Sequence, residues 1–488
     1  MNTNLDLHFF DFTKDDLPSP VSEIVRRERC KIQLRPFNRS AADFVANLSG
    51  RGTPFSFFVT AEEIETPVTP GVQTMAEGST EADVVICFDH QTEMLSQRLM
   101  DYVDARRIQI IAPITEAYFQ KKPLFLISIP KSGTHLLYQL VESLGYGRGV
   151  VFSDSPRPGC WYCLEYSNSH TSARDFFIDT VRRSPFGNRQ HPFLLSPALF
   201  MYRNPLDILI SEANYYHKDG NSPFYGYLAN RSFEERIMAL IEDPWLLGSI
   251  RERIGRFTPW VDFQNVIPVS FEEMIGPQGG GDREAQTKLI WSLQLKLHIP
   301  GNPLRYGNRV FNESSPTFHE GRIGSYRDRL SEKTCRLFQS LPQDFMAMLG
   351  YDAETVDTVP PIPKRADEFR MRPLKLGSQR FESTPITVEY DYMGHNIVKL
   401  RGDYYLVPMS YGGIDLAALD DEVLGCLKHE KGLSEAKARI ILGRRWGFLK
   451  KVMDLWTRRR FRGKYDRCMK RKSGKGQGQR VSRNGSQK

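Results

Sequence analysis

The sequence predicts an α/β fold in which a parallel sheet is flanked by helices, with an α/β region before it and a small β-rich module after it. Residues 124–129 (LFLISI) form an apolar run typical of a buried strand, and after a short loop apolar residues recur at helical spacing up to Leu144. Residues 198–202 (ALFMY) repeat this strand-to-helix order. Between residues 386 and 408 the pattern changes to short strands and turns, which is typical of a β-meander.

The length of 488 residues and the hydrophobic content of 40% suffice for two or three domains. We divide the chain into an N-terminal accessory α/β region, a core, a Pro-rich linker, a β-rich module and a basic tail. Their boundaries are 1–121, 122–350, 351–380, 381–442 and 443–488.

The accessory region carries alternating strand and helix signals but no recognisable site. Strands are predicted at 55–59, 83–88 and 108–111, and a helix at 92–103. Residues 65–83 are rich in Thr, Pro, Gly and Glu, which predicts a surface loop. We expect this region to be structural or to recognise a partner or substrate.

The loop between the strand at 124–129 and its helix reads Pro130-Lys131-Ser132-Gly133-Thr134. A strand, a tight loop and a helix N-terminus form a common anion site, because the first helical N–H groups lack internal partners and the helix dipole favours negative charge there. Gly133 permits a close backbone approach and Lys131 supplies a point charge. A Walker loop has its glycines before the lysine, so this is not an ordinary ATPase loop.

A second strand-to-helix junction carries Arg203, Asn204 and Pro205. Proline is favourable at the first position of a helix, because its ring fixes φ and its missing N–H is not needed there. Arg203 therefore lies just before a helix N-terminus, where a guanidinium can bind a phosphate through two parallel hydrogen bonds. Ser211 follows eight residues later and could add a hydroxyl donor.

Together these motifs resemble those of the sulfotransferases that use 3′-phosphoadenosine 5′-phosphosulfate (PAPS), over about residues 122–350. PKSGTHLL resembles the 5′-phosphosulfate loop of that family, and YRNPLDILIS resembles its 3′-phosphate motif. The resemblance implies a P-loop-like core and a catalytic Lys131. It also implies that the 5′-phosphate is bound by Ser132, Gly133, Thr134 and His135. The ligands that it implies for the 3′-phosphate are Arg203 and Ser211.

Two further landmarks resemble the family with departures. Phe271 stands where the family usually has the Tyr that packs near the adenine, in a strand-end motif that continues Glu272-Glu273-Met274. Residues 317–327 resemble the segment that folds over the nucleotide: Gly321 and Gly324 keep its spacing, and we expect Arg322 to supply the charge that His319-Glu320 lack. Between the two landmarks, residues 282–298 predict an amphipathic helix.

The family places a general-base histidine between its first two motifs, and this chain has two candidates there. His191-Pro192-Phe193 resembles the family's His-x-Pro-aromatic turn with the intervening residue missing, so we favour His191. His170 is the alternative, in a stretch (residues 150–190) that predicts loops with one helix at about 172–182. No metal is required by such chemistry, and no ligand cluster is visible in the sequence.

The resemblance implies transfer of a sulfuryl group from PAPS to a hydroxyl or amine of an acceptor. Two other classes stay open. One is a catalytically inactive binding module, in which the altered segment at 319–320 no longer closes over the nucleotide. The other is a P-loop-like kinase or nucleotide-binding enzyme, which the missing Walker pattern disfavours.

The net charge of +8 is concentrated at the C-terminus. Residues 444–488 hold 17 Lys and Arg against two Asp, a local charge of +15, so the rest of the chain carries −7. Trp446, Leu449, Met453 and Trp456 fall on one helical stripe amid these charges, which is typical of a helix lying in an anionic membrane interface. Packing of the stripe on the protein is the next alternative, and nucleic acid is the least favoured partner. Because this tail is typical of a membrane surface, we expect the acceptor to be a carbohydrate or a lipid-linked molecule.

The remaining features are consistent with a cytoplasmic protein, peripheral to a membrane if the tail binds one. The acidic N-terminus lacks the pattern of a secretory signal, and no apolar run is long enough for a membrane span. The seven cysteines are scattered and odd in number, which suits free thiols, and Cys160-x-x-Cys163 is the one pair with ligand or redox spacing. For the β-rich module we favour a packing or dimerisation role over acceptor recognition.

Overall fold

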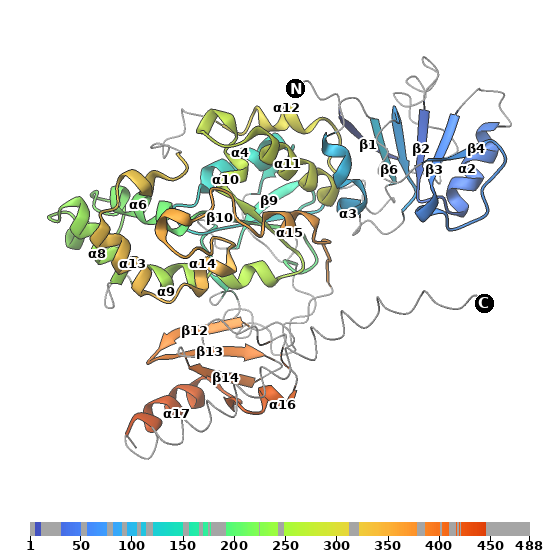
Figure 1. Cartoon of the computed structure of the whole chain (residues 1–488). Coiled ribbons are helices and arrows are strands. Elements are labelled where there is room, and N and C mark those ends of the chain that lie inside the picture. Colours follow the sequence, from blue (N-terminus) through green and yellow to red (C-terminus); the bar gives the residue numbers. More distant parts are fainter. Residues whose placement is uncertain are drawn as a thin grey trace, which may run out of the picture.

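The computed structural model contains three β-sheets, two of them parallel, with helices packed around them (Figure 1). It describes residues 5–10, 31–49, 56–75, 82–89, 95–104, 109–113, 121–149, 156–164, 169–173, 176, 192–223, 225–242, 248–311, 322–377, 386–400, 403–408, 416, 419 and 421–445.

The N-terminal region forms a six-stranded parallel sheet with the order β1-β6-β5-β2-β3-β4. Its strands are β1 (Asp6–Phe10), β2 (Lys31–Arg35), β3 (Ser56–Thr60), β4 (Val72–Met75), β5 (Val84–Cys87) and β6 (Gln109–Pro113). Its helices are α2 (Arg39–Ser49) and α3 (Leu95–Leu99), with the 3-10 helices η1 (Ala61–Glu63) and η3 (Met100–Asp104).

Strands β3, β5 and β6 form where apolar runs predict them, and α3 with η3 lies within the predicted helix at 92–103. Strand β4 is a difference, because it lies inside the stretch predicted as a surface loop. All four of its residues are exposed or half-buried, so the apolar pattern that marks a buried strand is missing there. Strands β1 and β2 and helix α2 were not predicted.

The core holds a five-stranded parallel sheet with the order β11-β10-β7-β9-β8. Its strands are β7 (Leu124–Ser128), β8 (Gly147–Arg148), β9 (Cys160–Cys163), β10 (Ala198–Tyr202) and β11 (Val266–Ser270). Every residue of β7, β10 and β11 is buried, as expected when helices cover both faces of a parallel sheet. The α/β fold class, with a parallel sheet flanked by helices and a β-rich C-terminal module, is confirmed.

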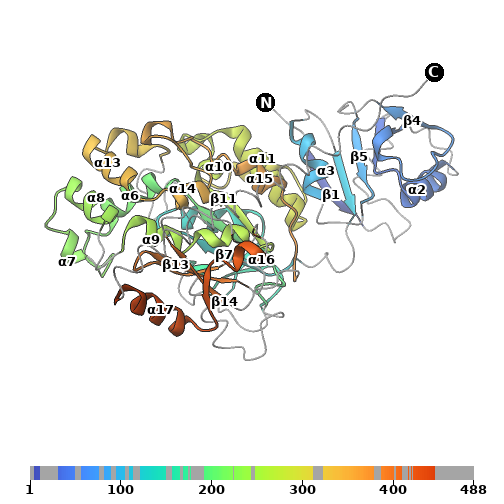
Figure 2. The ribbon, with the colours of Figure 1, turned by 60° about the horizontal axis from the view of Figure 1, so that its bottom comes forward.

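The helices of the core lie on both sides of this sheet (Figure 2). They are α4 (Thr134–Ser143), α6 (Pro205–Tyr215), α7 (Tyr225–Leu228), α8 (Phe233–Glu242), α9 (Ile250–Gly255), α10 (Phe271–Met274), α11 (Arg283–Leu297), α12 (Pro303–Gly307), α13 (Glu332–Ser340) and α14 (Asp344–Met348). Short 3-10 helices are η5 (Thr258–Asp262), η6 (Pro277–Gly279), η7 (Ser325–Asp328) and η8 (Val356–Thr358).

Helix α11 forms where an amphipathic helix is predicted at 282–298, but its polar residues are not confined to solvent, because 12 of its 15 residues are buried. The N-terminal sheet region packs on the side that would otherwise face solvent. There the indole Nε1 of Trp291 donates to the carbonyl oxygen of Leu99 at 3.0 Å, and Leu7 of β1 pairs with Gly301 through two backbone hydrogen bonds. The accessory region and the core therefore share one packed interface.

The stretch predicted as a linker at 351–380 includes an ordered helix that packs on the core. Residues 366–371 form helix α15 (Ala366–Met371), whose Phe369 is buried in the main hydrophobic cluster of the core. The ammonium of Lys296 on α11 donates to the carbonyl oxygens of Phe369 and Arg370 at 3.0 and 2.6 Å. Helix α15 is therefore held to the core by packing and by hydrogen bonds, within the stretch whose prolines predicted a linker.

The C-terminal module is an antiparallel sheet with the order β12-β13-β14-β15, flanked by two helices (Figure 1). Its elements are β12 (Ile386–Tyr392), β13 (His395–Leu400), β14 (Asp403–Pro408), β15 (Lys428–Glu430), α16 (Asp421–Leu424) and α17 (Leu433–Arg445). Val388 and Ile397 belong to the same buried cluster as the core side chains, and β12 packs against α9. The predicted meander is confirmed, whereas the Trp-containing stripe at 446–456 lies outside the described residues.

Two sequence signals have plain structural explanations. Cys160 and Cys163 stand at opposite ends of β9 and are not joined in a disulfide; because side chains alternate along a strand, residues three apart point to opposite faces. This pair therefore does not share a ligand. None of the helices in the described ranges combines the length and apolar content that a membrane span requires.

Candidate active site

The three sequence motifs meet because their strands are neighbours. β10 pairs with β7 on one side and with β11 on the other, and Ala198 of β10 lies opposite Phe125 and Val266. Since the strands are parallel and in register, their carboxyl ends reach the same edge of the sheet, which is where ligands bind in sheets of this kind. Lys131, Arg203 and Phe271 all follow these strand ends.

The phosphate-type loop is fixed to β10 by backbone bonds. The N–H of Ile129 donates to the carbonyl oxygen of Met201 at 3.0 Å, and the N–H of Ser132 donates back to Ile129 at 3.0 Å. The Ser132 hydroxyl also turns inward and donates to the carbonyl oxygens of Ile129 and Met201 at 2.7 and 3.1 Å. Ser132 is fully buried, so it shapes the loop and its donors do not face an incoming anion.

Gly133 makes the turn into α4. Its φ of 106° is a left-handed conformation, and a Cβ placed there would lie 2.8 Å from both Met201 and Phe271. Gly133 stands at the N-cap position of the helix that begins at Thr134 and has no side chain with which to cap it. The N-terminus of α4 therefore keeps the unpaired N–H groups and the positive dipole end that bind anions.

Lys131 has a φ of 66°, which is strained for a residue with a side chain. Its ammonium lies over the ring of Tyr215, 3.5 Å from the ring centroid. Burial lowers the pKa of Lys131 to about 8; the carboxylate of Glu212 opposes this change, and the charge of Arg203 adds to it. The pKa of Lys131 is therefore far closer to neutral pH than that of an exposed lysine.

Thr134 connects the loop to His170. Its hydroxyl hydrogen-bonds the Ser128 hydroxyl at 2.8 Å and the Nε2 atom of His170 at 3.2 Å, and Ser128 in turn bonds the Ser169 hydroxyl at 2.5 Å. Burial, together with the nearby charges of Lys131 and His135, lowers the pKa of His170 to about 4. The structure thus places His170 at the loop as a neutral imidazole, whereas His191, the favoured base, lies outside the described residues.

His135 lies on the first turn of α4 with part of its side chain open to solvent. Partial burial of its ring, together with the charge of Lys131, lowers its pKa. Its ring meets that of Tyr138 edge-on, with centroids 5.7 Å apart. A neutral His135 leaves Lys131 as the principal charge on this side of the loop.

Arg203 lies on the other side of the site, buried to 8% exposure. Its guanidinium stands over the Phe271 ring at 4.1 Å, and one NH2 group donates to the carbonyl oxygen of Arg322 at 2.7 Å. The Asp207 carboxylate is 3.7 Å away. The Nε–H of Arg203 is buried and has no hydrogen-bond partner among the described residues, so one donor of this fork is available.

Residues beneath Arg203 fix its position. Asn204 caps α6 by accepting from the N–H of Leu206 at 3.0 Å, and its own N–H donates to the buried carboxylate of Glu272 at 2.9 Å. The Tyr351 hydroxyl donates to the other oxygen of Glu272 at 2.5 Å. Burial raises the pKa of Glu272 to about 7.

Phe271 and Ser211 are the other two residues predicted to contact the nucleotide on this side of the site. The Phe271 ring is buried between Gly133 and Arg203, and so joins the two halves of the site. Ser211 is half-buried on α6, two turns after the helix begins, and its hydroxyl forms no hydrogen bond within the described part of the chain.

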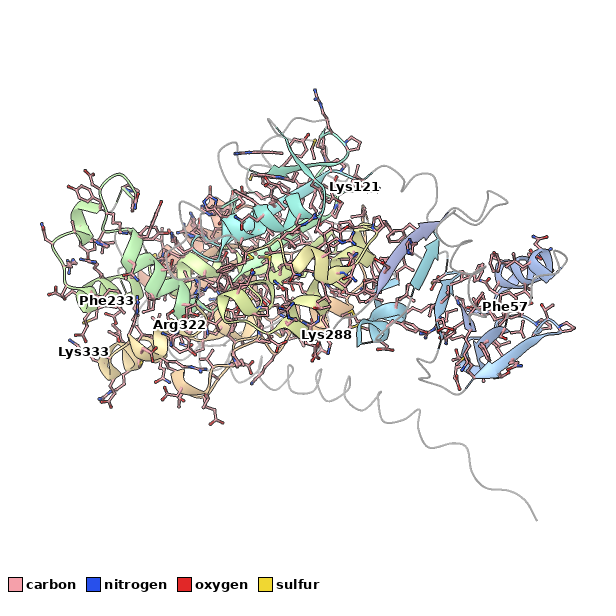
Figure 3. The ribbon with its side chains drawn as sticks, turned by 90° about the horizontal axis from the view of Figure 1, so that it is seen from above. Phe57, Lys121, Phe233, Lys288, Arg322 and Lys333 are labelled. Carbon is pink, nitrogen blue, oxygen red and sulfur yellow. The ribbon has the colours of Figure 1, made fainter. Side chains whose placement is uncertain are left out.

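The segment around Arg322 departs from expectation. The Arg322 side chain is 64% exposed and pairs with Asp328 at 2.9 Å, so its carbonyl oxygen and not its charge faces Arg203. Figure 3 shows Arg322 in the half of the core that lies away from the N-terminal sheet, with Phe233 and Lys333 further out. The N–H groups of Gly324 and Tyr326 donate to Asp207 at 2.8 and 3.3 Å, which docks this segment on α6. Gly321 and the pair at 319–320 lie outside the described residues.

Three features of the site were missed from the sequence: Tyr215 under Lys131, the hydroxyls of Ser128 and Ser169, and the buried carboxylate of Glu272. Tyr215 stands four residues after Ser211 and so on the same face of α6, a spacing that could have pointed to it. The hydroxyl chain depends on a contact between segments 41 residues apart, and no local pattern indicates it.

Within the described ranges there is no group of three His, Cys, Asp or Glu side chains that could hold a metal ion. No family profile and no curated protein matches the chain. Among solved structures, the mouse sulfotransferase SULT7A1 complexed with PAP shares 18% identity at a TM-score of 0.30, with 52% of this chain and 89% of that one covered. Retinol dehydratase, in complex with androsterone and the inactive cofactor PAP, shares 13% identity at a TM-score of 0.26, with 50% and 84% covered. At these scores the function has to be argued from the site residues themselves.

Proposed function

We propose that this chain transfers a sulfuryl group from PAPS to a hydroxyl or amine of an acceptor. One observation carries the proposal: an uncapped helix N-terminus with Lys131 and a buried Arg203 with an available Nε–H donor lie at the same sheet edge, joined by the Phe271 ring. Two anion sites bridged by an aromatic face suit a nucleotide that carries phosphates at both its 3′ and 5′ positions.

Each residue has a defined task in this proposal. The N–H groups of Gly133, Thr134 and His135 bind the 5′-phosphate, and Lys131 neutralises the charge that develops on the bridging oxygen when the sulfuryl group leaves. Arg203 and Ser211 hold the 3′-phosphate, and Phe271 packs against the adenine. Transfer of this type depends on in-line positioning and charge stabilisation. In support of the proposal, the charged groups stand on a loop and a helix start that strands β7 and β10 hold side by side.

The general base remains a choice between two histidines. We keep His191 as the proposed base on its motif position. His170 is the alternative, and its bond to Thr134 places it beside the loop. We expect His191→Ala to abolish transfer of labelled sulfuryl from PAPS. If that variant keeps near-full turnover at every pH while His170→Ala is inactive, the base is His170.

A second candidate function has a specific observation in its favour. One NH2 group of Arg203 already donates to the Arg322 carbonyl oxygen, and Asp207 lies 3.7 Å from the guanidinium. An arginine engaged in this way would suit a sulfotransferase-like module that no longer binds nucleotide. A kinase-like activity, the third class, predicts dependence on ATP and magnesium.

Thermal melting of the full chain separates these classes. A ligand that binds only the folded state stabilises it by about 2.7 kcal/mol at 100 times its Kd. We expect adenosine 3′,5′-bisphosphate to raise the melting temperature, Arg203→Ala and Lys131→Ala to remove the rise, and Arg336→Ala to keep it. Arg336 is a suitable control because its side chain is 72% exposed and pairs with Glu332 across one helical turn.

The alternatives give different results in the same experiment. A rise with ADP and magnesium alone contradicts the sulfotransferase proposal and favours the kinase class. No rise with either nucleotide favours the inactive module. A rise with the bisphosphate that survives in Arg203→Ala would locate the nucleotide elsewhere.

For the acceptor we propose a carbohydrate or a lipid-linked molecule at an anionic membrane surface, reached through the basic tail. The support is the sequence of residues 443–464, whose paired Trp and flanking Lys and Arg suit an interfacial helix. The test is binding to vesicles of phosphatidylserine and phosphatidylcholine against phosphatidylcholine alone. Binding to the anionic vesicles that persists after truncation before residue 443 contradicts this part of the proposal.

A further inference from the structure

Tyr215 is the last residue of α6, and the ammonium group of Lys131 lies over the face of its ring. The Lys131 ammonium nitrogen lies 3.5 Å from the ring centroid, well inside the distance at which a cation is attracted by an aromatic face. Tyr215 follows Ser211 by one helical turn, so both side chains lie on the same face of α6. The contact therefore ties the loop after β7 to the helix after β10.

Lys131 has no carboxylate partner in the part of the chain that the structure describes. Glu212 is the acid that faces it, but this carboxylate pairs with Arg253 at 2.6 Å. The other charged groups around Lys131 are cations, Arg203 on β10's carboxyl side and Lys218 after α6, and both oppose its charge. The titratable neighbours on the loop side are His135 and His170.

We propose that Tyr215 is a positioning residue for Lys131, whose ring face takes the place of a counter-ion and keeps the ammonium protonated at the strand edge. A carboxylate in this position would form a salt bridge that an incoming anion would have to break. An aromatic face attracts the cation without cancelling its charge. The proposal rests on the proposed function, in which Lys131 meets the 5′-phosphate and the bridging oxygen.

Burial supports this assignment, because it lowers the pKa of Lys131 to about 8 and so leaves the charged and neutral forms close in free energy near that pH. At such a balance, the attraction of the ring decides how much of the lysine is charged. Removing the ring's charge distribution while keeping its apolar bulk should decrease the proton affinity of Lys131 about tenfold.

The test compares Tyr215→Phe, which keeps the ring face, with Tyr215→Leu, which keeps the bulk alone. The full chain is acetylated with an amine-reactive ester over a pH range, and modification of the peptide that contains Lys131 is followed by mass spectrometry. We expect the proton affinity of Lys131 to be unchanged in the Phe variant and to be about tenfold lower in the Leu variant. Tyr215→Met serves as a second apolar variant if the Leu variant does not fold. Unchanged titration in the apolar variant, or an equal change in the Phe variant, overturns the proposal.

A second readout ties the contact to nucleotide binding. With half of Lys131 charged at pH 8 in the wild type and about a tenth in the Leu variant, affinity for adenosine 3′,5′-bisphosphate should fall about fivefold at pH 8 and not at pH 6. A purely structural loss would weaken binding equally at both pH values, which contradicts the proposal. If neither the wild type nor any variant binds the bisphosphate, the proposed function fails. The acetylation result still decides the role of Tyr215 in that case.

Discussion

The adjacent acids Glu272 and Glu273 should respond in opposite ways when their charge is removed. Both are buried, with 1% and 2% exposure. Glu272 accepts from the N–H of Asn204 and the hydroxyl of Tyr351 and forms no ion pair in the described ranges, and burial raises its pKa to about 7. Its amide isostere can keep both contacts, because the glutamine oxygen accepts from Asn204 and the amide NH2 group donates to the tyrosine oxygen.

The magnitude follows from the two pKa values. In the unfolded chain Glu272 ionises at about its ordinary pKa of 4.5, whereas in the folded chain it stays protonated until about pH 7. Folding stability contributed by this group is therefore complete below pH 4.5 and is lost as the pH rises through 7, a total of about 3 kcal/mol at pH 8. We expect Glu272→Gln to be more stable than the wild type, with a gap that widens by about 2.5 kcal/mol from pH 5 to pH 8.

Urea unfolding at pH 5 and pH 8 measures this gap, since the free energy of unfolding falls linearly with denaturant. Glu273→Gln is the matched control. Glu273 forms a buried ion pair with Arg370 and accepts from the Ser270 hydroxyl at 2.5 Å. Burial raises the pKa of Glu273 too, but the change leaves Arg370 only the exposed carboxylate of Asp367 as a charged partner, so it should destabilise the protein by about 2 kcal/mol. A pH-independent gap for Glu272→Gln, or the same sign for both variants, would refute the reasoning.

Two further predictions use paired variants, each measured as the change in free energy of unfolding in urea. Gly133→Ala should destabilise the protein by about 2 to 4 kcal/mol, because alanine is strained in the left-handed conformation and its Cβ would also collide with Met201 and Phe271. Gly71→Ala is the control: its φ of 95° is also left-handed, but the space around its Cβ position is open, so the loss should be only about 1 kcal/mol. Equal losses would show that crowding by Met201 and Phe271 does not matter at Gly133. Lys296→Met should lose about 3 kcal/mol at pH 8, because the carbonyl oxygens of Phe369 and Arg370 lose their donor, while burial lowers the pKa of Lys296 to about 7 and leaves the amine mostly neutral at this pH. Lys288→Met on the same helix, whose ion pair with Glu284 is at the surface, should lose less than about 0.5 kcal/mol. A small loss at Lys296 would show that the α11–α15 contact does not depend on its hydrogen bonds.

The elements that the sequence predicts well are those whose signal is local. β7 and β10 are continuous apolar runs, and α6 begins with Asn204 and Pro205, a cap and a first-turn residue that specify a helix start by themselves. Gly133 is likewise predictable, because a left-handed turn before an uncapped helix needs a residue without a side chain. These features suffice to locate the loop and Arg203.

The elements that escape prediction depend on contacts distant in sequence. β4 is an edge strand without an apolar face, so its composition resembles that of a loop. α11 has the apolar stripe of a surface helix, and only the packing of the N-terminal sheet on its other side makes it buried. The inward turn of the Ser132 hydroxyl depends in the same way on a carbonyl of β10, 69 residues away.

The strand order explains why two remote motifs can serve one ligand. β7 and β10 are adjacent in the sheet, so the loop of Lys131 and the junction of Arg203 start about 4.8 Å apart, the spacing of paired strands. That spacing is set by backbone hydrogen bonds and leaves little freedom to side chains. Phe271, at the end of the next strand, lies between Gly133 and the guanidinium of Arg203 with a ring that carries no charge. Under the proposed function, a ligand that uses both sites presents one anionic group to the Lys131 loop and another to Arg203, with a flat apolar part against Phe271, and the strand order sets how far apart these groups lie.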